Sequence, residues 1–409
     1  MYFMKKARLI LFGSLFLLGC DKIEQKGQYL AQVPVFETME SIRAKANAIS
    51  TPRTITQAGK IYIYQDYLFI NEPNKGIHIY NNTDPSKPKA ISFLNIPGNV
   101  DLAVQEGKLY ADSFADLLTF DLADPTAPRL LARNENVFKT VLQKDYINNI
   151  PDVVVTGYRD SLVSYAYKNK YSPYEKKYLE YNESNSGVGQ GGSMARFTLA
   201  NKHLYAVDHS TLHLFNVQDS RKPVYVKDVK LGFGIETVFP YKNNLFIGSN
   251  TGMLIFDIST ASEPTELSRY AHIRACDPVV VNDKYAFVTL RTGSACGGQQ
   301  NLLEVVDIQD LKNPTLKYTY SLENPHGLAL SDQTLYVCDG DYGFKSFDAS
   351  DVSKIGDKLL ENIKELKSMD VIAGPKSLLV TGSNGLYQYN YSNRAKLKEL
   401  SVIPVIKSN

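Results

Sequence analysis

The sequence contains no Trp, only four Cys and almost no net charge. Its 45 Lys and Arg are balanced by 43 Asp and Glu, so the formal net charge is +2 over 409 residues. A chain so close to neutrality has no long-range positive field to hold a polyanion, and we expect no nucleic-acid partner. Charged residues make up 22% and hydrophobic residues 44%, which excludes a largely disordered chain. The 27 Tyr and 18 Phe that are present suit the half-buried surfaces of β-strands.

Catalytic and cofactor motifs are also missing. The sequence has no His-Glu-x-x-His, Gly-x-Ser-x-Gly, Cys-x-x-Cys or phosphate-binding Gly-Lys-Ser/Thr motif. We therefore predict no cofactor and no metal site, and we assign no catalytic residue. The turn Asp339-Gly340-Asp341 offers two carboxylates. Because Ca²⁺ takes about six to eight oxygen ligands, we interpret this segment as an ordinary turn.

A long apolar run occurs only at the N-terminus. Lys5, Lys6 and Arg8 precede an apolar segment at 9–18. That segment is shorter than the about 20 residues needed to span a bilayer, and the pattern is typical of a secretory signal peptide. It ends in Leu17-Leu18-Gly19-Cys20, which resembles the lipobox of bacterial lipoproteins, where the Cys is acylated, for instance with palmitate, and becomes the N-terminus.

We therefore predict a signal peptide at 1–19 and lipidation of Cys20. The acyl chains would anchor the protein to a membrane of the bacterial cell envelope, and we favour the outer membrane over the inner. A secreted protein that carries an unmodified Cys at this place is the alternative. Residues 20–54 are interpreted as the lipidated Cys, a polar tether and an N-terminal segment. Within that segment, 33–49 either donates a closing strand to the fold or forms a short helix.

A five-residue pattern recurs seven times in the rest of the chain: apolar, variable, usually apolar, aromatic or Val, then Asp or Asn. Its last residues lie at positions 81, 121, 216, 257, 307, 348 and 390, which are 40, 95, 41, 50, 41 and 42 residues apart. In the first five copies a Pro follows seven residues later, at 88, 128, 223, 264 and 314. Asp, Asn and Pro end strands and build turns, so we interpret the acidic positions as turn residues and not as a catalytic ring. His78 and His213 occupy the variable position, where we expect them to be exposed.

The repeat predicts an all-β fold. Each period of about 41 residues contains four short strand-like segments, with no helix between them to make parallel crossovers. Antiparallel blades therefore fit better than a solenoid, and we predict a β-propeller of seven four-stranded antiparallel blades over residues 55–404. The longest spacing places a Tyr-rich insertion, at about 136–192, between blades 2 and 3.

Two segments carry a resemblance to a known family. Phe256-Asp257-Ile258-Ser259 through Glu263-Pro264, and Val306-Asp307-Ile308-Gln309 through Asn313-Pro314, resemble the LVIVD-repeat proteins. These are secreted or lipid-anchored bacterial β-propellers, mostly without an assigned activity. The resemblance covers about 55–404 and implies the fold, but no specific function. In the last two copies of the repeat, Ile355 and Leu397 replace the Pro.

Both insertions are expected on one face of the propeller. The 136–192 segment joins a fourth strand to the next first strand, and the surplus at 291–300 joins a second strand to a third; such connections emerge on the same side of the disc. Loops on a rigid scaffold usually carry function, so we predict that this face binds a partner. In the larger insertion, 153–155 and 162–165 are predicted to pair as a hairpin. Its tyrosines either contact a protein or glycan, or form a lid that packs its own side chains.

Polar residues begin the predicted inner strands, which converge on the axis. We therefore expect a ring of ligand-binding candidates at the mouth of the central channel, consisting of Asp101, Arg196, Glu236, Arg274, Asp277, His326 and Asp370. A set of salt bridges that plugs the channel is the alternative. Cys276 and Cys296 are expected in loops of this same face, where an oxidising compartment permits a disulfide. Cys338 would remain as a buried thiol in a strand.

These features predict an envelope-anchored β-propeller lipoprotein that binds or scaffolds a protein or a glycan through the face bearing the 136–192 and 291–300 loops. We favour binding over catalysis. The alternative is a glycan-directed hydrolase or lyase that uses His326 with acidic residues at the mouth, such as Asp101, Glu236, Asp277 and Asp370. A mainly structural surface protein is a third hypothesis. The expected partners are the membrane, through the lipid anchor, and an envelope protein or glycan.

Overall fold

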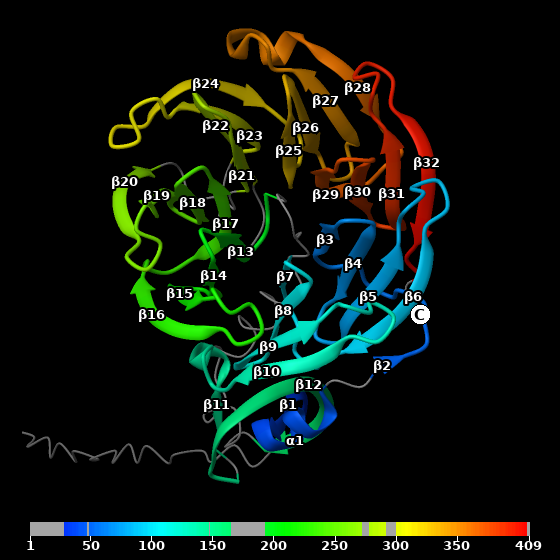
Figure 1. Ribbon diagram of the computed structural model, residues 1–409, viewed down its shortest axis with the longest axis vertical. Coiled ribbons are helices and arrows are strands. Elements are labelled where there is room, and N and C mark those ends of the chain that lie inside the picture. Colours follow the sequence, from blue (N-terminus) through cyan, green and yellow to red (C-terminus); the bar gives the residue numbers. More distant parts are fainter. Residues whose placement is uncertain are drawn as a thin grey trace, which may run out of the picture.

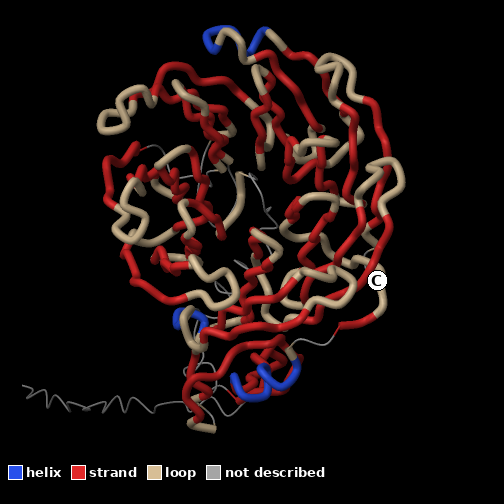
Figure 2. The backbone as a smooth tube through the Cα atoms, viewed as in Figure 1, coloured by secondary structure: helices blue, strands red, loops and turns tan. Residues whose placement is uncertain are grey.

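The computed structural model describes residues 28–46, 49–146, 148–164, 193–271, 278–291 and 300–406. Strands dominate these residues, and the few helical turns lie outside the central part of the molecule (Figure 2). Antiparallel sheets follow one another along the described chain, and we number those of four or five strands I to VII. In the described part, no helix is long and apolar enough to cross a membrane.

Sheets I to III come first along the chain. Sheet I contains β3 (Ile61–Tyr64), β4 (Tyr67–Glu72), β5 (Gly76–Asn81) and β6 (Lys89–Asn95), with the short β2 (Ile49–Ser50) added outside β6. Sheet II contains β7 (Leu102–Gln105), β8 (Lys108–Ser113), β9 (Asp116–Asp121) and β10 (Arg129–Asn134). Sheet III contains β13 (Phe197–Ala200), β14 (His203–Val207), β15 (Thr211–Asn216) and β16 (Val224–Lys230).

The remaining four sheets repeat the same order. Sheet IV contains β17 (Ile235–Tyr241), β18 (Asn244–Ser249), β19 (Gly252–Asp257) and β20 (Thr265–Ala271). Sheet V contains β21 (Val279–Val281), β22 (Tyr285–Leu290), β23 (Leu302–Asp307) and β24 (Thr315–Ser321). Sheet VI contains β25 (Leu328–Ser331), β26 (Thr334–Cys338), β27 (Phe344–Asp348) and β28 (Leu359–Ile363), with the 3-10 helix η2 (Val352–Asp357) before β28. Sheet VII contains β29 (Ser368–Ala373), β30 (Leu378–Gly382), β31 (Gly385–Asn390) and β32 (Lys398–Pro404).

The five-residue pattern forms the third strand of every one of these sheets. In each copy the final Asp or Asn accepts a hydrogen bond from the backbone amide two residues later, as Asp257 does from Ser259 at 2.7 Å and Asn216 from Gln218 at 2.8 Å. This geometry confirms that these residues end strands and begin turns.

The sheets are arranged around a centre, with their first strands innermost and their fourth strands outermost (Figure 1). Tyrosines on second strands join neighbouring sheets: Tyr110 Oη donates to the Ser220 carbonyl and Tyr205 Oη to the Ala261 carbonyl, both at 2.9 Å. Each sheet of the ring lies between two neighbouring sheets, so most residues of its middle strands are buried.

His78 and His213 show the consequence of this two-sided burial. Both were expected to be exposed, and this prediction is wrong, because both are almost fully buried. The apolar neighbours of each His pack toward the next sheet, and the variable position points to the opposite face, which is covered as well: His78 packs against Phe93 and His213 against Phe138. Each imidazole is accommodated there by carboxylates: His78 Nε2 lies 2.8 Å from Glu72 Oε2, and His213 lies between Asp208 and Asp228.

A further three-stranded sheet, in the order β1-β12-β11, lies outside the ring beside β10 (Figure 1). It contains β1 (Gln28–Thr38), β11 (Gln143–Asp145) and β12 (Ile150–Ser164), together with α1 (Met39–Lys45) and the 3-10 helix η1 (Lys139–Val141) nearby. The segment 33–49 therefore supplies both strand and a short helix: β1 joins the insertion, and only Ile49, at the start of β2, pairs with the ring. Thr38 caps α1 by accepting from the Ser41 amide at 3.3 Å.

The predicted hairpin between 153–155 and 162–165 is wrong. Residues 150–164 form one continuous strand whose long partner is β1. The register shifts between Val35 and Phe36, so that a bulge near Gly157 absorbs the irregularity and the strand continues without a turn. The pairing partner lies more than a hundred residues away, where the local sequence pattern does not reveal it.

Candidate functional site

The inner strands begin at one side of the ring, and polar side chains gather there. Asp101 and Arg196 stand directly before β7 and β13, and His326 lies two residues before β25. Glu236 and Asp370 fall within the first three residues of β17 and β29. The starts of the inner strands therefore bring together residues that are far apart in the sequence. They meet at one opening of the central channel, which we call the mouth.

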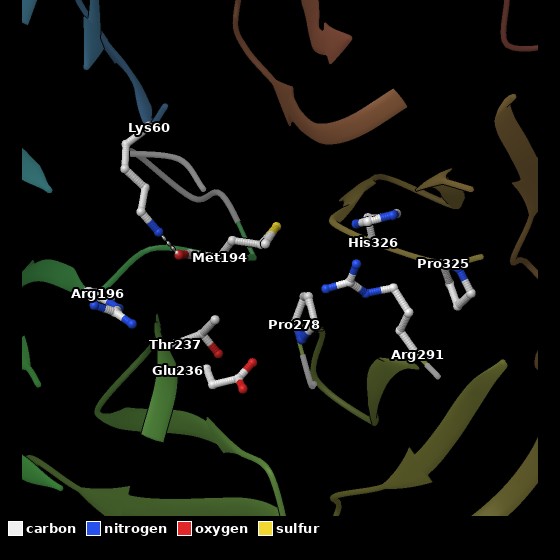
Figure 3. A pocket seen from close by; sticks show the side chains of 9 residues that line it. All are labelled: Lys60, Met194, Arg196, Glu236, Thr237, Pro278, Arg291, Pro325 and His326. Carbon is white, nitrogen blue, oxygen red and sulfur yellow. Dashed lines mark hydrogen bonds between the residues drawn. The ribbon is translucent and has the colours of Figure 1, made fainter. Parts of the chain in front are cut away.

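A small cavity occupies this mouth (Figure 3). We call it the mouth cavity; it is lined by Lys60, Met194, Arg196, Glu236, Thr237, Pro278, Arg291, Pro325 and His326. Its volume is about 20 Å³, which is room for a water molecule or one small polar group. Met194 follows the 136–192 insertion, and Arg291 begins the 291–300 insertion. The described ends of the two insertions therefore meet at the same cavity.

The segment 193–196 crosses the centre of the ring and connects several sheets. Lys60 Nζ, beside sheet I, donates to the Met194 carbonyl, and the Val238 amide of sheet IV donates to the Ala195 carbonyl at 2.7 Å. Ser193 Oγ accepts from the Leu328 amide of sheet VI at 2.9 Å. The amides of Arg196 and Phe197 donate to the Asp101 carboxylate, next to sheet II. The end of the insertion thus braces the hub of the ring.

Asp101 and Asp370 lie beside Lys60 behind the mouth cavity and do not line it. Burial lowers the pKa of Lys60 to about 8, while the neighbouring Asp101 carboxylate opposes this shift. Burial likewise raises the pKa of Asp101, and it raises that of Asp370 to about 7. Asp370 Oδ1 accepts from the Val371 amide at 2.8 Å, whereas its Oδ2 has no hydrogen-bond partner among the described residues. This part of the hub is a buried charge cluster.

His326 and Arg291 form the opposite wall of the cavity. Burial, and then the positive charge of Arg291, lower the pKa of His326 to about 3, so the imidazole is neutral at physiological pH. Its Nδ1 is buried without a hydrogen-bond partner in the described chain. The backbone around it is held by the Thr289 hydroxyl, which donates to the His326 carbonyl at 2.6 Å. Burial also lowers the pKa of Arg291, and the charge of Glu236 opposes that shift.

Of the seven predicted ligand-binding candidates, Arg196, Glu236 and His326 line the cavity together. Arg274 and Asp277 lie outside the described residues, as do Cys276 and Cys296 of the predicted disulfide. Cys338 is buried in β26, as expected.

Three polar lining residues, Lys60, Thr237 and Arg291, were not among the candidates. Lys60 immediately precedes β3 as Asp101 precedes β7, so the same rule applied to the first repeat would have found it. Arg291 was recognised only as the first residue of an insertion.

The turn at 339–341 is an ordinary turn. The Asp339 carboxylate accepts from the Asn324 amide at 2.7 Å and pairs with Lys345, and Asp341 pairs with Lys367 at 2.8 Å. Elsewhere in the described ranges, no group of His, Cys, Asp and Glu is placed to hold a metal ion.

The ring of antiparallel sheets, with polar side chains at the mouth of its hub, defines an all-β protein of propeller-like architecture. Comparison with solved structures agrees. The periplasmic gluconolactonase PpgL of Pseudomonas aeruginosa superposes with a TM-score of 0.54 at 10% identity, covering 86% of this chain and 96% of that one. The computationally designed protein Ika8 gives 0.51 at 8% identity, with coverage of 86% and 89%. At such identities the similarity concerns the fold alone.

The repeat itself is recognised at the sequence level. Residues 240–272 and 274–321 match the family model of the LVIVD repeat. The chain therefore carries LVIVD repeats, which confirms the resemblance found in the sequence. The two matches extend from β17 through β24 and so cover most of sheets IV and V. No curated protein shows significant sequence similarity to this chain.

Proposed function

We propose that this protein is a lipid-anchored, seven-bladed β-propeller that binds or scaffolds a protein or glycan partner at the bacterial cell envelope. Sheets I to VII would be the blades. The binding surface would be the mouth face, which we define as the side on which the first strands begin. The observation that supports this most is the meeting of both insertion ends with Arg196, Glu236 and Arg291 at one cavity. Charged side chains from separate sheets converge at this cavity. The repeat pattern that builds the sheets does not require charged residues at these positions.

The size of the cavity favours a macromolecular partner. A space of about 20 Å³ admits one polar group, whereas small-molecule sites usually measure hundreds of Å³. Phe233 lies on the same face, in the connection from β16 to β17, and its side chain is 83% exposed. Exposed aromatics beside Arg residues are common anchors at protein interfaces. We infer that a partner places a polar group in the mouth cavity and covers Phe233.

Site-specific photo-crosslinking tests the mouth face. A benzoylphenylalanine at position 233 should yield discrete adducts in intact cells, and Arg291→Ala should reduce their yield by about tenfold, as expected for an anchor worth about 1.4 kcal/mol. The matched control is the same probe at Leu316, the second residue of β24, which lies on the opposite face and is 47% exposed. Adducts at 316 but not at 233 would contradict the proposed binding face. Equal adduct yields from the parent protein and the Arg291→Ala variant would show that the mouth cavity does not take part in binding the partner.

A glycan hydrolase or lyase is the second candidate function. Glu236 and His326 line the same cavity, and a carboxyl group and an imidazole are side chains that general acid–base catalysis uses. The propeller-like neighbour PpgL is a gluconolactonase, so lactones belong in the substrate panel with envelope glycans. Glu236→Gln and His326→Ala should each lower kcat by about a hundredfold or more if these groups transfer protons. No turnover by the parent protein on this panel would end the hypothesis.

The anchor is tested separately. Metabolic labelling with an alkyne analogue of palmitate should mark the parent protein but not a Cys20→Ser variant. That variant should also leave the membrane fraction, because the acyl chains supply stable anchoring. Equal membrane recovery of both proteins would argue for another mode of attachment.

A further inference from the structure

Two leucines on the sheet outside the ring form an exposed apolar pair. In the antiparallel pairing of β1 with β12, Leu30 lies directly opposite Leu162. Their side chains are 68% and 65% exposed, among the most exposed large apolar side chains of the described residues. Val33 and Val163 point to the other face of the sheet and are buried. The sheet therefore has a covered face and an open face, and the leucine pair lies on the open one.

The pair lies at the end of the sheet that is remote from the ring. At the near end, Val154 and the helix residues Met39 and Ile42 pack against Ala115 of sheet II. β1 has 11 residues, so its beginning lies roughly 33 Å from this attachment. Gln28, the first residue of β1, pairs with Ser164, the last residue of β12. The open leucines are thus close to the point where the chain leaves the sheet toward its N-terminus.

The length of chain before β1 identifies what the leucines can contact. Cys20 precedes Gln28 by eight residues, which reach at most about 28 Å when fully extended. If Cys20 is acylated, the start of β1 is held permanently within that distance of a bilayer. A soluble partner would have to be captured from solution, whereas the bilayer surface is always present beside the pair. The lipid bilayer is therefore the occupant that the connectivity favours.

We propose that Leu30 and Leu162 enter the interfacial region of the membrane next to the acylated Cys20. This inference rests on the proposed lipid anchor. The ring is then attached to the membrane through the sheet that lies beside β10, at its rim (Figure 1), and the mouth face stays accessible to a partner.

The absence of Trp from the chain provides a direct test. Single Leu30→Trp and Leu162→Trp variants each introduce one indole, and the acylated proteins are reconstituted in vesicles containing brominated phosphatidylcholine. We expect bromine to lower their Trp emission about twofold or more, because an indole prefers the interface where the bromines reach it. Two matched variants serve as controls: Phe233→Trp on the mouth face and Leu316→Trp on the opposite face. Both should keep their emission.

The outcomes separate the inference from the function on which it rests. Acylated protein bound to vesicles, with no quenching at positions 30 and 162, would overturn the membrane contact and leave the anchor intact. Quenching at 233 in place of 30 would show that the mouth faces the bilayer, which also overturns it. If mass spectrometry finds no acyl chain on Cys20, the anchor and the inference fail together. Thermal melts of the variants establish that each of them is folded.

Discussion

At the scale of single residues, His213 shows how one buried side chain ties an insertion to a sheet. Its Nδ1 lies 2.8 Å from Asp228 Oδ1 and its Nε2 lies 3.1 Å from Asp208 Oδ2. Asp208 also accepts from the Thr140 hydroxyl at 2.9 Å, and Thr140 belongs to the beginning of the 136–192 insertion. The cluster therefore links β15, the turn before it and the insertion.

Asp208 gives a prediction for acid stability. Burial opposes its ionisation, but the hydrogen bonds from His213 and from the Ser210 amide outweigh burial and lower its pKa to about 2. A carboxyl group with a folded-state pKa below its unfolded value of 3.8 stabilises the fold above pH 3.8, and this contribution is lost as the pH falls toward 2. Asp208→Asn should therefore lower the free energy of unfolding by about 2 kcal/mol at pH 6 and by much less near pH 2.5.

Urea unfolding followed by circular dichroism at the two pH values measures this difference. The control is Asp219→Asn, which removes a fully exposed carboxylate that pairs only locally with Arg221. It should leave the unfolding midpoint almost unchanged at either pH. A loss that is equally large at both pH values would show that Asp208 does not act through its charge.

At the scale of elements, α1 is attached to sheet II through a buried carboxylate. Asp116 is fully buried and accepts from Arg43 at 2.8 and 2.9 Å and from Arg133 at 2.9 Å. Arg43 also donates to Asn136 at 3.0 Å, so it joins the N-terminal segment to the start of the insertion. A single side chain thus couples two parts of the chain that lie outside the ring.

Arg43→Ala should release this attachment. The substitution leaves Asp116 with Arg133 as its remaining cation and should cost about 1–3 kcal/mol locally, because a buried carboxylate loses a charge-assisted partner. Hydrogen exchange within 28–46 should become faster, while exchange in sheets III to VII stays the same. The control is Lys45→Ala, since Lys45 pairs with Glu37 at the surface. Unchanged exchange in the Arg43→Ala variant would refute the clamp.

The cysteine thiols give a second prediction at the scale of elements. Cys338 is fully buried, and burial raises the pKa of its thiol well above the usual value, so it should not react in the native protein. If Cys276 and Cys296 are joined and Cys20 is acylated, denatured but unreduced protein should contain one thiol that titrates with Ellman's reagent. Three thiols would eliminate the disulfide. The same titration after reduction calibrates the count.

At the scale of the whole molecule, the ring closes where sheet VII meets sheet I. Ile55 and Val405 form a parallel bridge there, and the amides of Asn82 and Gln388 bond reciprocally at 3.0 and 2.8 Å. The equivalent residues between sheets III and IV, Leu214 and Ile258, belong to one apolar cluster. Each amide satisfies a donor and an acceptor of the other, so this pair distinguishes the closing contact from the apolar ones.

Gln388→Leu should lower the stability of the whole ring by about 1–3 kcal/mol, because it leaves the buried Asn82 amide without its partner. The double variant Asn82→Leu, Gln388→Leu should recover most of this loss, since it replaces both polar groups by apolar ones. A double-mutant cycle from urea unfolding measures the coupling. If the double variant loses as much as the sum of the single variants, the two amides act independently and do not specify closure.

The candidate site was only partly predictable from the sequence. The rule that polar residues begin inner strands selected Arg196, Glu236 and His326, which line the mouth cavity. It also selected Asp101 and Asp370, which turn away to Lys60, because the rule gives the position of a residue along the strand but not the direction of its side chain. The prediction that His78 and His213 are exposed was wrong for a related reason. Their burial depends on what packs against the strand and not on the strand alone.

By itself the sequence determined the number and order of the third strands, their turns and the propeller-like class, because alternation, Asx turns and Pro act over a few residues. Only the tertiary structure decided that β1 pairs with β12, that 193–196 crosses the hub, and that Gln388 meets Asn82. These contacts join residues at least 43 positions apart, and most of the pairs are about a hundred or more positions apart. They depend on how the assembled sheets bring distant surfaces together, and no local pattern of the chain contains that information.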